Sequence, residues 1–282
     1  MTVYKLFYII IGAILTISLA IVLLQDLQLF PGVISGLAFK GTRPKEFIPN
    51  DIHNYYVDVN GKNQVETWYY KGSSGRTLSD YNVIFFHGNA ETLEDAHQVQ
   101  EWLDKLGLST LTFSYRGYAY STGWPSAKHL LEDALKVWAF AVSELKFQPE
   151  KTIFVGRSIG TGPATYLASQ VKPGALVLIS PYTSLKVIVQ SRSFLKYFAP
   201  FLWNNINQAE DLSKLDPKLC LAIVHGENDS IIPVSQSQQL YESLPDKSRT
   251  FFKRYPGAEH VNVIDFAKED IEQQLINCLK RN

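Results

Sequence analysis

Hydrophobic residues after residue 50 fall into short apolar runs separated by longer amphipathic stretches. The runs include "YNVIFF", "STLTFSY", "KTIFV", "ALVLIS" and "CLAIVHG", which are rich in branched and aromatic residues and are typical of buried strands. Helices are predicted among and after them, at about residues 93–106, 127–145, 234–244 and 263–279. This alternation predicts one α/β domain with a mainly parallel sheet covered by helices on both faces.

An antiparallel pair of strands precedes the parallel part. "NYYVDVNG" and "QVETWYY" flank Asn60-Gly61, a dipeptide typical of tight hairpin turns. In sheets of this kind, ligands bind beyond the carboxyl ends of the parallel strands. Residues that directly follow strands are therefore the candidates for function.

The N-terminus differs from the rest of the chain. Residues 6–25 carry no charge, and Tyr4 to Leu24 would measure roughly 30 Å as a helix, which matches a bilayer core. A cleaved signal peptide would have a shorter apolar region and a small-x-small site, whereas bulky residues follow Ala20. A buried helix of a soluble protein is a third interpretation. We expect residues 1–26 to form a signal-anchor transmembrane helix.

This prediction makes the protein single-pass and membrane-bound, but it does not give the orientation. Lys5 precedes the apolar segment, while Lys40, Arg43 and Lys45 follow it, so positive charge lies on both sides. Proline and glycine are frequent in residues 27–50, which are predicted to be a linker. Residues 51–282 are predicted to be the folded domain.

Composition excludes some classes of protein. The 282 residues are 46% hydrophobic, which is enough for a sizeable core. Lys plus Arg and Asp plus Glu both total 27, so the net charge is zero. The chain therefore lacks the excess of positive charge that would indicate a nucleic-acid partner. Cys220 and Cys278 show neither C-x-x-C nor metal-binding spacing, and each is predicted to be a buried free thiol.

The motif "VGRSIGTGPA" around Ser158 carries the strongest chemical signal. It lies between a predicted strand and a predicted helix, the context in which G-x-S-x-G exposes a serine hydroxyl. Gly156 and Gly160 permit the tight reversal, and the helix N-terminus favours negative charge that develops during acyl transfer. The simpler interpretation is a small residue in a turn. A base and an acid elsewhere in the chain decide between the two.

His260 is the best candidate for the base. It lies in "YPGAEHVN", a loop after the last predicted strand and before the last helix. Three other histidines are predicted to be ordinary surface groups, namely His53, His97 and His129. The remaining two, His87 and His225, each end a strand before a glycine, where a structural hydrogen bond is the simpler interpretation.

Asp229 is the best candidate for the acid. It directly follows a strand in "VHGENDSIIP", whereas Asp216 precedes that strand and is expected at the opposite edge of the sheet. The order Ser158, Asp229, His260 is the order of hydrolases that have a nucleophile elbow. We predict that these three residues form a catalytic triad.

Together the motifs resemble the α/β-hydrolase superfamily over residues 51–282. "FFHGNA", "SYRGYAYSTG", "VGRSIGTGPA", "ISPYTSL", "VHGENDSIIP" and "PGAEH" are similar to segments of membrane-anchored serine hydrolases of the BEM46 and ABHD13/ABHD17-like group. The resemblance implies a sheet of eight-stranded type. The chain departs from that group at four positions, where an acid or a glycine is usual: Ser114, Ala119, Glu91 and Glu259.

The predicted chemistry is acyl transfer to Ser158. The backbone N–H of Ile159 would hold the oxyanion, and resemblance of the "HGNA" turn implies that the N–H of Asn89 does so too. Neither a metal nor an organic cofactor is required. A serine at the elbow, rather than aspartate, indicates ester, thioester or amide substrates.

A predicted cap insertion at about residues 184–214 bears on the substrate. It contains "SFLKYFAPFLWNNINQAE", and Phe194, Phe198 and Trp203 are candidates to line an acyl pocket, although an aromatic stripe at this spacing is more often part of the core. With the predicted anchor, this insertion favours a lipid-like acyl substrate, either a glycerolipid ester or an S-acylated protein.

Two other classes of function stay open. A serine peptidase of aminopeptidase type would need an acidic pocket for the substrate amine, and Glu91, Glu227 and Glu259 lie near the predicted site. A catalytically silent scaffold at the membrane is the other class, but the complete set of triad residues argues against it.

Overall fold

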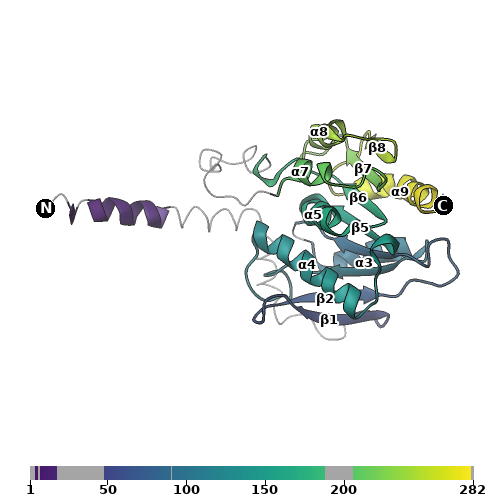
Figure 1. The fold of residues 1–282 in the computed structure, drawn as a ribbon, viewed down its shortest axis with the longest axis horizontal. Helices are drawn as coiled ribbons and strands as arrows, with labels where there is room; N and C mark the ends of the chain where they lie inside the picture. The colour runs from purple at the N-terminus through teal and green to yellow at the C-terminus, as the bar shows by residue number, and fades with distance from the viewer. Residues whose placement is uncertain (1–3, 6, 18–47, 90, 188–205, 281–282) are drawn as a thin grey trace.

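The computed structural model describes residues 4–5, 7–17, 48–89, 91–187 and 206–280. Its central feature is an eight-stranded sheet in the order β1-β2-β4-β3-β5-β6-β7-β8 (Figure 1). β2 runs antiparallel to both β1 and β4, and the remaining neighbours are parallel. The strands are β1 (Ile52–Asp58), β2 (Gln64–Tyr70), β3 (Asn82–Phe86), β4 (Ser109–Phe113), β5 (Thr152–Arg157), β6 (Ala175–Ile179), β7 (Cys220–Gly226) and β8 (Thr250–Tyr255).

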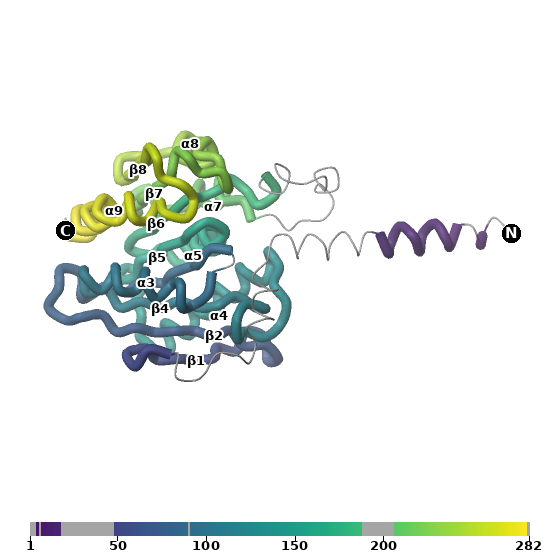
Figure 2. The backbone as a smooth tube through the Cα atoms, turned by 180° about the vertical axis from the view of Figure 1, so that it is seen from behind, coloured from purple at the N-terminus to yellow at the C-terminus, as the bar shows by residue number. Residues whose placement is uncertain are grey.

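Helices cover both faces of this sheet (Figures 1 and 2). Alternate strand residues point to opposite faces, so Ile84 and Phe86 belong to one core, and Val83 and Phe85 to the other. The first core includes α4 (Ala127–Ser143), α5 (Thr161–Val171), α7 (Gln208–Ser213) and α8 (Ser235–Ser243), and the second includes α3 (Leu93–Asp104) and α9 (Val263–Leu279). The predicted α/β architecture and the mainly parallel sheet are confirmed.

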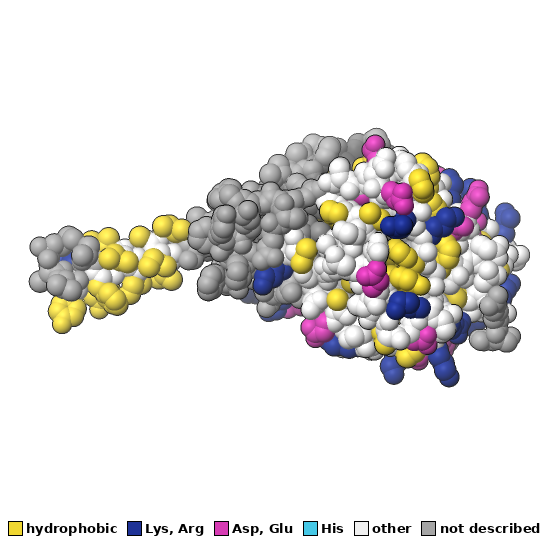
Figure 3. Space-filling model, turned by 90° about the horizontal axis from the view of Figure 1, so that it is seen from above, with side chains coloured by type: hydrophobic (Ala, Val, Ile, Leu, Met, Phe, Trp, Pro, Cys, Tyr) yellow, Lys and Arg dark blue, Asp and Glu magenta, His cyan; other side chains and the backbone are white. Residues whose placement is uncertain are grey.

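Residues 7–17 form a helix whose side chains are all exposed. Its hydrophobic side chains, yellow in Figure 3, cover much of this segment, whereas charged groups are interspersed on the visible face of the domain. No helix in the described ranges is both long enough and apolar enough to cross a membrane. Residues 1–3, 6 and 18–26 of the predicted transmembrane segment lie outside the described residues.

Only the ends of the predicted cap insertion are described. Ser184 pairs with Asn207 in an isolated antiparallel bridge, so the two ends of the insertion lie side by side at the sheet. Phe194, Phe198 and Trp203, the predicted acyl-pocket residues, lie outside the described part of the chain, as does most of the predicted linker.

The two cysteines form a disulfide, so the prediction of two free thiols was wrong. Cys220 is the first residue of β7, and Cys278 lies in the last turn of α9. Because α9 packs back along the sheet from the carboxyl ends of the strands, these residues meet at the opposite edge with their Cα atoms 5.8 Å apart. They are 58 residues apart in sequence, and no local pattern indicates the pairing.

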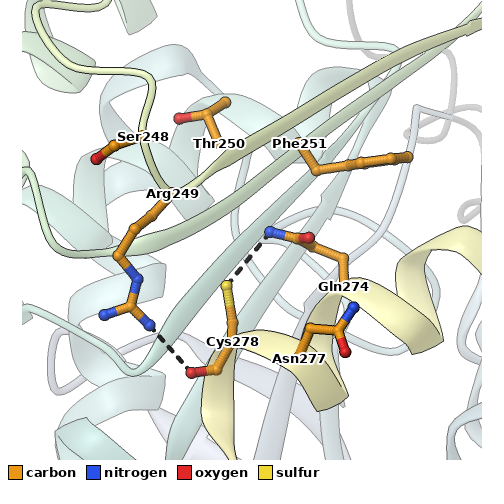
Figure 4. A pocket seen from close by; sticks show the side chains of 7 residues that line it. All are labelled: Ser248, Arg249, Thr250, Phe251, Gln274, Asn277 and Cys278. Carbon is orange, nitrogen blue, oxygen red and sulfur yellow. Dashed lines mark hydrogen bonds between the residues drawn. The ribbon is translucent and has the colours of Figure 1, made fainter. Parts of the chain in front are cut away.

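The disulfide borders a polar pocket of about 370 Å³ at the amino end of β8. In Figure 4, Cys278 lies between Gln274 and Arg249, and the Arg249 guanidinium donates to the Cys278 carbonyl oxygen at 3.0 Å. This pocket is at the edge of the sheet where the strands begin. It is therefore remote from the edge where α/β sheets place their ligands.

Removing the disulfide is expected to destabilise the domain without changing its chemistry. Polymer entropy predicts that a cross-link closing a loop of this length stabilises the fold by about 4 kcal/mol. Cys278→Ala should lower the free energy of unfolding in urea by about 2 to 4 kcal/mol relative to the oxidised protein. Alkylation of two thiols in the denatured, unreduced protein would contradict the disulfide.

Candidate active site

Ser158 lies at a sharp turn between β5 and α5. A short 3₁₀ turn, Ser158–Gly160, joins the two elements, and Ser158 has a positive φ of 53°. Such a backbone conformation is unfavourable for a residue with a side chain and persists only where surrounding packing enforces it. The hydroxyl of Tyr182 donates to the Ile159 carbonyl at 3.1 Å and helps to hold the turn.

Both glycines of the motif are required by close backbone contacts. A Cβ atom on Gly160 would overlap the carbonyl oxygens of Phe86 and His87 in the neighbouring strand end. A Cβ atom on Gly156 would meet the Cα of Thr161 at 2.7 Å, because α5 begins directly against β5. The G-x-S-x-G spacing therefore follows from how closely the helix approaches the sheet.

His260 lies beside Ser158 in the loop between β8 and α9. Its Nε2 is 2.9 Å from Ser158 Oγ, and its Nδ1 is 2.6 Å from Asp229 Oδ2. An ionised carboxylate only accepts hydrogen bonds, so Nδ1–H donates to Asp229. In the neutral ring this leaves Nε2 as the acceptor for the Ser158 hydroxyl proton, the tautomer that a general base requires.

Asp229 is held in place by four donors. Its Oδ1 accepts the backbone N–H groups of Ile231 at 2.8 Å and Ile232 at 2.7 Å. Its Oδ2 faces His260 and also lies 3.2 Å from Nε2 of His225. Burial raises the pKa of the Asp229 carboxyl, but the hydrogen bonds from His225 and His260 outweigh burial and hold the pKa well below its ordinary value. The carboxylate therefore stays ionised at neutral pH.

His225 has a role that the sequence did not reveal. The predicted structural hydrogen bond exists, because Nε2 lies 2.8 Å from the Ile232 carbonyl oxygen. A carbonyl only accepts, so Nε2 carries the proton, and the same nitrogen lies 3.2 Å from Asp229 Oδ2. The one local hint is that His225 and Asp229 are four residues apart at the end of β7, but this spacing alone does not show that the ring lies beside the carboxylate.

Asp216 and His87 lie where the sequence predicted them. Asp216 precedes β7 at the opposite edge, where its Oδ1 accepts the Lys218 N–H at 2.8 Å. His87 is fully buried and its Nδ1 lies 2.8 Å from the Gly88 carbonyl oxygen, and burial lowers its pKa. Neither group reaches Ser158 through a described hydrogen bond.

The two predicted oxyanion donors lie at the ends of adjacent strands. Ile159 follows Ser158, and Asn89 follows β3, which pairs with β5 through Phe86 and Gly156. The Asn89 side chain accepts a hydrogen bond from the Tyr118 hydroxyl at 2.7 Å. Tyr118 precedes Ala119, whose φ of 42° explains why glycine is usual at that position.

The fold and the serine at a strand-to-helix turn define an α/β hydrolase, and comparison with known proteins gives the family. The chain belongs to the family described as Serine aminopeptidase, S33 (Hydrolase_4), whose model matches residues 79–220. The superfamily predicted from the sequence is thereby confirmed.

Curated relatives are named as lipases. The lysophosphatidylserine lipase ABHD12 of Bos taurus is 28% identical, with 80% of this chain and 68% of the relative covered. The ABHD12 of Danio rerio is 27% identical, with 71% and 60% covered. This chain thus spans about two thirds of the length of these relatives.

Solved structures with the same fold include an esterase. The Pyrococcus furiosus esterase Pf2001 has a TM-score of 0.64 at 20% identity, with 85% of this chain and 95% of that chain covered. Est1E of Butyrivibrio proteoclasticus has a TM-score of 0.66 at 17% identity, with 80% and 100% covered. These two structures share the fold of this chain, while the family match and the relatives named as lipases support its assignment as a serine hydrolase.

Proposed function

We propose that this protein is a membrane-associated serine hydrolase that cleaves an acyl ester of a lipid-like substrate. In this proposal Ser158 is the nucleophile, His260 is the general base and Asp229 orients the base. The observation that supports it most is the unbroken chain of hydrogen bonds from Ser158 Oγ through His260 to Asp229, with spacings of 2.9 and 2.6 Å.

The reaction follows from these positions. His260 Nε2 takes the hydroxyl proton as Ser158 Oγ attacks the carbonyl carbon, and Asp229 stabilises the resulting imidazolium. The N–H groups of Ile159 and Asn89 hold the oxyanion. The imidazolium then protonates the oxygen of the leaving alcohol. The alcohol departs, and the acyl group stays on Ser158 as an acyl-enzyme. Water, deprotonated by His260, hydrolyses the acyl-enzyme and regenerates the Ser158 hydroxyl.

Three features support a lipid-like substrate. The relatives are named lysophosphatidylserine lipases. The uncharged N-terminal segment would keep the domain near a bilayer. Phe194, Phe198 and Trp203 in the cap insertion would provide an apolar surface for the acyl chain. A lysophospholipid or a related monoacyl glycerolipid has the ester and the single chain that fit these features.

A thioester of an S-acylated protein is the less supported substrate. Disulfides persist mainly in oxidising compartments. The Cys220–Cys278 bond therefore favours a domain on the non-cytosolic side of its membrane, away from acylated cytosolic proteins. A closer relationship to the BEM46 and ABHD13/ABHD17-like group stays a prediction.

An aminopeptidase activity is the second candidate, because the family is described by that activity. Two of the three acids that could form its acidic pocket are already paired with arginines. Glu91 forms an ion pair with Arg157, and Glu227 lies 3.6 Å from Arg254 Nε. A substrate ammonium group would have to compete with these internal cations.

The substrate class can be tested with one ester series. p-Nitrophenyl pentanoate has three more methylene groups than p-nitrophenyl acetate. Burial of these groups at about 0.8 kcal/mol each predicts that kcat/KM is roughly 50-fold higher for the pentanoate. A monoacyl glycerophospholipid should be cleaved as well, with release of the fatty acid measured by mass spectrometry. A flat ester series, together with faster cleavage of aminoacyl p-nitroanilides, would favour the peptidase instead.

We also propose that residues 1–26 anchor the enzyme in a membrane. Deleting them should move esterase activity from the membrane pellet to the supernatant, with kcat on a soluble ester within a few-fold of the full chain. Protease treatment of sealed membranes gives the side on which the domain lies. Activity that stays in the washed pellet after the deletion would contradict the anchor.

A further inference from the structure

Arg157, the residue directly before Ser158, contacts two other loops of the site. Its Nη1 lies 2.5 Å from Glu91 Oε1, and its Nη2 donates to the Val261 carbonyl at 3.0 Å and the His260 carbonyl at 3.4 Å. The side chains of Arg157 and Glu91 are only 16% and 17% exposed. This ion pair is therefore shielded from water more than a typical surface pair.

The second carboxylate oxygen of Glu91 accepts a hydrogen bond from the predicted oxyanion loop. Oε2 accepts the backbone N–H of Gly88 at 2.5 Å. A Cβ atom on Gly88 would lie 3.0 Å from the Glu91 carboxylate, so the loop is closely packed around this group. One carboxylate thus links the turn that carries Asn89 to the residue that precedes Ser158.

The sheet joins the ends of β3 and β5, but it does not join them to the loop after β8. In the strand order β3-β5-β6-β7-β8, the loop after β8 is separated from Ser158 by two intervening strands. His260 must reach across them to place Nε2 on Ser158 Oγ. Arg157 lies at the end of β5 and donates hydrogen bonds to the backbone of that distant loop at His260, the proposed general base, and at Val261.

We propose that Arg157 and Glu91 are positioning residues that hold the base, the nucleophile and the oxyanion loop in register. This inference rests on the proposed function of Ser158 and His260. Fixing reacting groups in a productive geometry accelerates chemistry strongly, and a displacement of about 1 Å costs on the order of 10²-fold. The planar guanidinium suits this role, because it donates to a carboxylate and to carbonyl oxygens at the same time.

Because Arg157 and Glu91 carry opposite charges, removing one charge is not equivalent to removing the other. Arg157→Gln would release the His260 loop and leave the Glu91 carboxylate unneutralised beside the predicted oxyanion donors, where it opposes the anionic transition state. Glu91→Gln keeps an acceptor for the Gly88 N–H and leaves the bonds from Arg157 to the His260 loop in place. The arginine substitution is therefore expected to cost more than the glutamate substitution.

The test uses p-nitrophenyl butyrate, a neutral ester, and the full chain with its N-terminal segment. We expect kcat to fall roughly 10²-fold in Arg157→Gln and roughly 10-fold in Glu91→Gln, with KM changed less than about threefold in both. Arg157→Lys should recover little, since one ammonium group cannot bridge Glu91 and the Val261 carbonyl. Glu269→Gln, on the exposed face of α9, is the matched control and should retain wild-type kcat.

Coupling between the residues distinguishes positioning from two separate effects. The double variant Glu91→Gln/Arg157→Gln should lose less activity than the product of the single losses, because the unpaired carboxylate is absent. Independent losses, or unchanged kcat in both single variants, would overturn the proposal. A rise in KM confined to anionic lysophospholipids would also overturn it and make Arg157 a substrate-binding group.

Failure of this inference is distinguishable from failure of the proposed function. The rate of Ser158 labelling by a fluorophosphonate should fall in parallel with kcat in the two single variants. If wild type and both variants label at the same rate on Ser158, the positioning role fails while the nucleophile stands. If Arg157→Gln does not fold, Glu91→Gln, which keeps the bonds from Arg157 to the His260 loop, still tests the role of the carboxylate through kcat and the labelling rate.

Discussion

Ser158→Ala is expected to lower kcat for ester hydrolysis by a factor on the order of 10⁶, as loss of a serine nucleophile does in other hydrolases of this chemistry. The substitution removes one oxygen and leaves His260 without a group to deprotonate. The backbone strain at φ 53° is the same for alanine as for serine. The variant should therefore fold with an unchanged melting temperature, and the loss would come from chemistry alone.

Ser180 offers a matched control within the same sheet edge. It directly follows β6, is buried, and has a positive φ of 51°, close to that of Ser158. Its side chain has no role in the proposed mechanism. Ser180→Ala should keep kcat within a few-fold of wild type under the same assay. Equal losses in the two variants would show that a strained serine at this edge matters for folding rather than for catalysis.

Asp229→Asn is expected to lower kcat about 10⁴-fold, the cost of the wrong histidine tautomer in serine proteases. The structure explains how the amide would be oriented. Two backbone N–H groups, from Ile231 and Ile232, point at Oδ1 and require an oxygen there. The new NH₂ group must then replace Oδ2 and donate to His260 Nδ1, so that Nε2 carries a proton toward Ser158.

Asp216→Asn is the control for this substitution and should stay within a few-fold of wild type. Its carboxylate only closes a turn with Lys218 before β7, at the opposite edge of the sheet. Measuring kcat/KM at several pH values is necessary, because a base that has lost its carboxylate recovers partly in alkali. A crippled Asp216→Asn beside a normal Asp229→Asn would refute the assignment of the acid.

The sequence predicted those parts of the structure that depend on local pattern. The last helix was predicted at residues 263–279 and is Val263–Leu279, because its apolar positions repeat with a helical period against a buried strand. The hairpin at Asn60-Gly61 and the edge of the sheet that carries Ser158 follow from turn chemistry and strand order. Such features need only a few consecutive residues to be recognised.

Some features that depend on contacts between distant residues were missed. The Cys220–Cys278 bond exists because α9 returns along the sheet, which no spacing between the two cysteines reveals. The departure at Glu91 was visible in the sequence, but its meaning depends on Arg157, which is brought beside it only when β3 pairs with β5. Likewise, His225 could be placed at a strand end but not beside the carboxylate of Asp229.

Covalent labelling tests the central claim, that Ser158 is the nucleophile, most directly. The full-length protein is treated with a fluorophosphonate, and the site of modification is mapped by peptide mass spectrometry. The account predicts one adduct on the peptide that contains Ser158, complete loss of that adduct in Ser158→Ala, and undiminished labelling in Ser180→Ala. An adduct on a different residue, or equal labelling of wild type and Ser158→Ala, would contradict it.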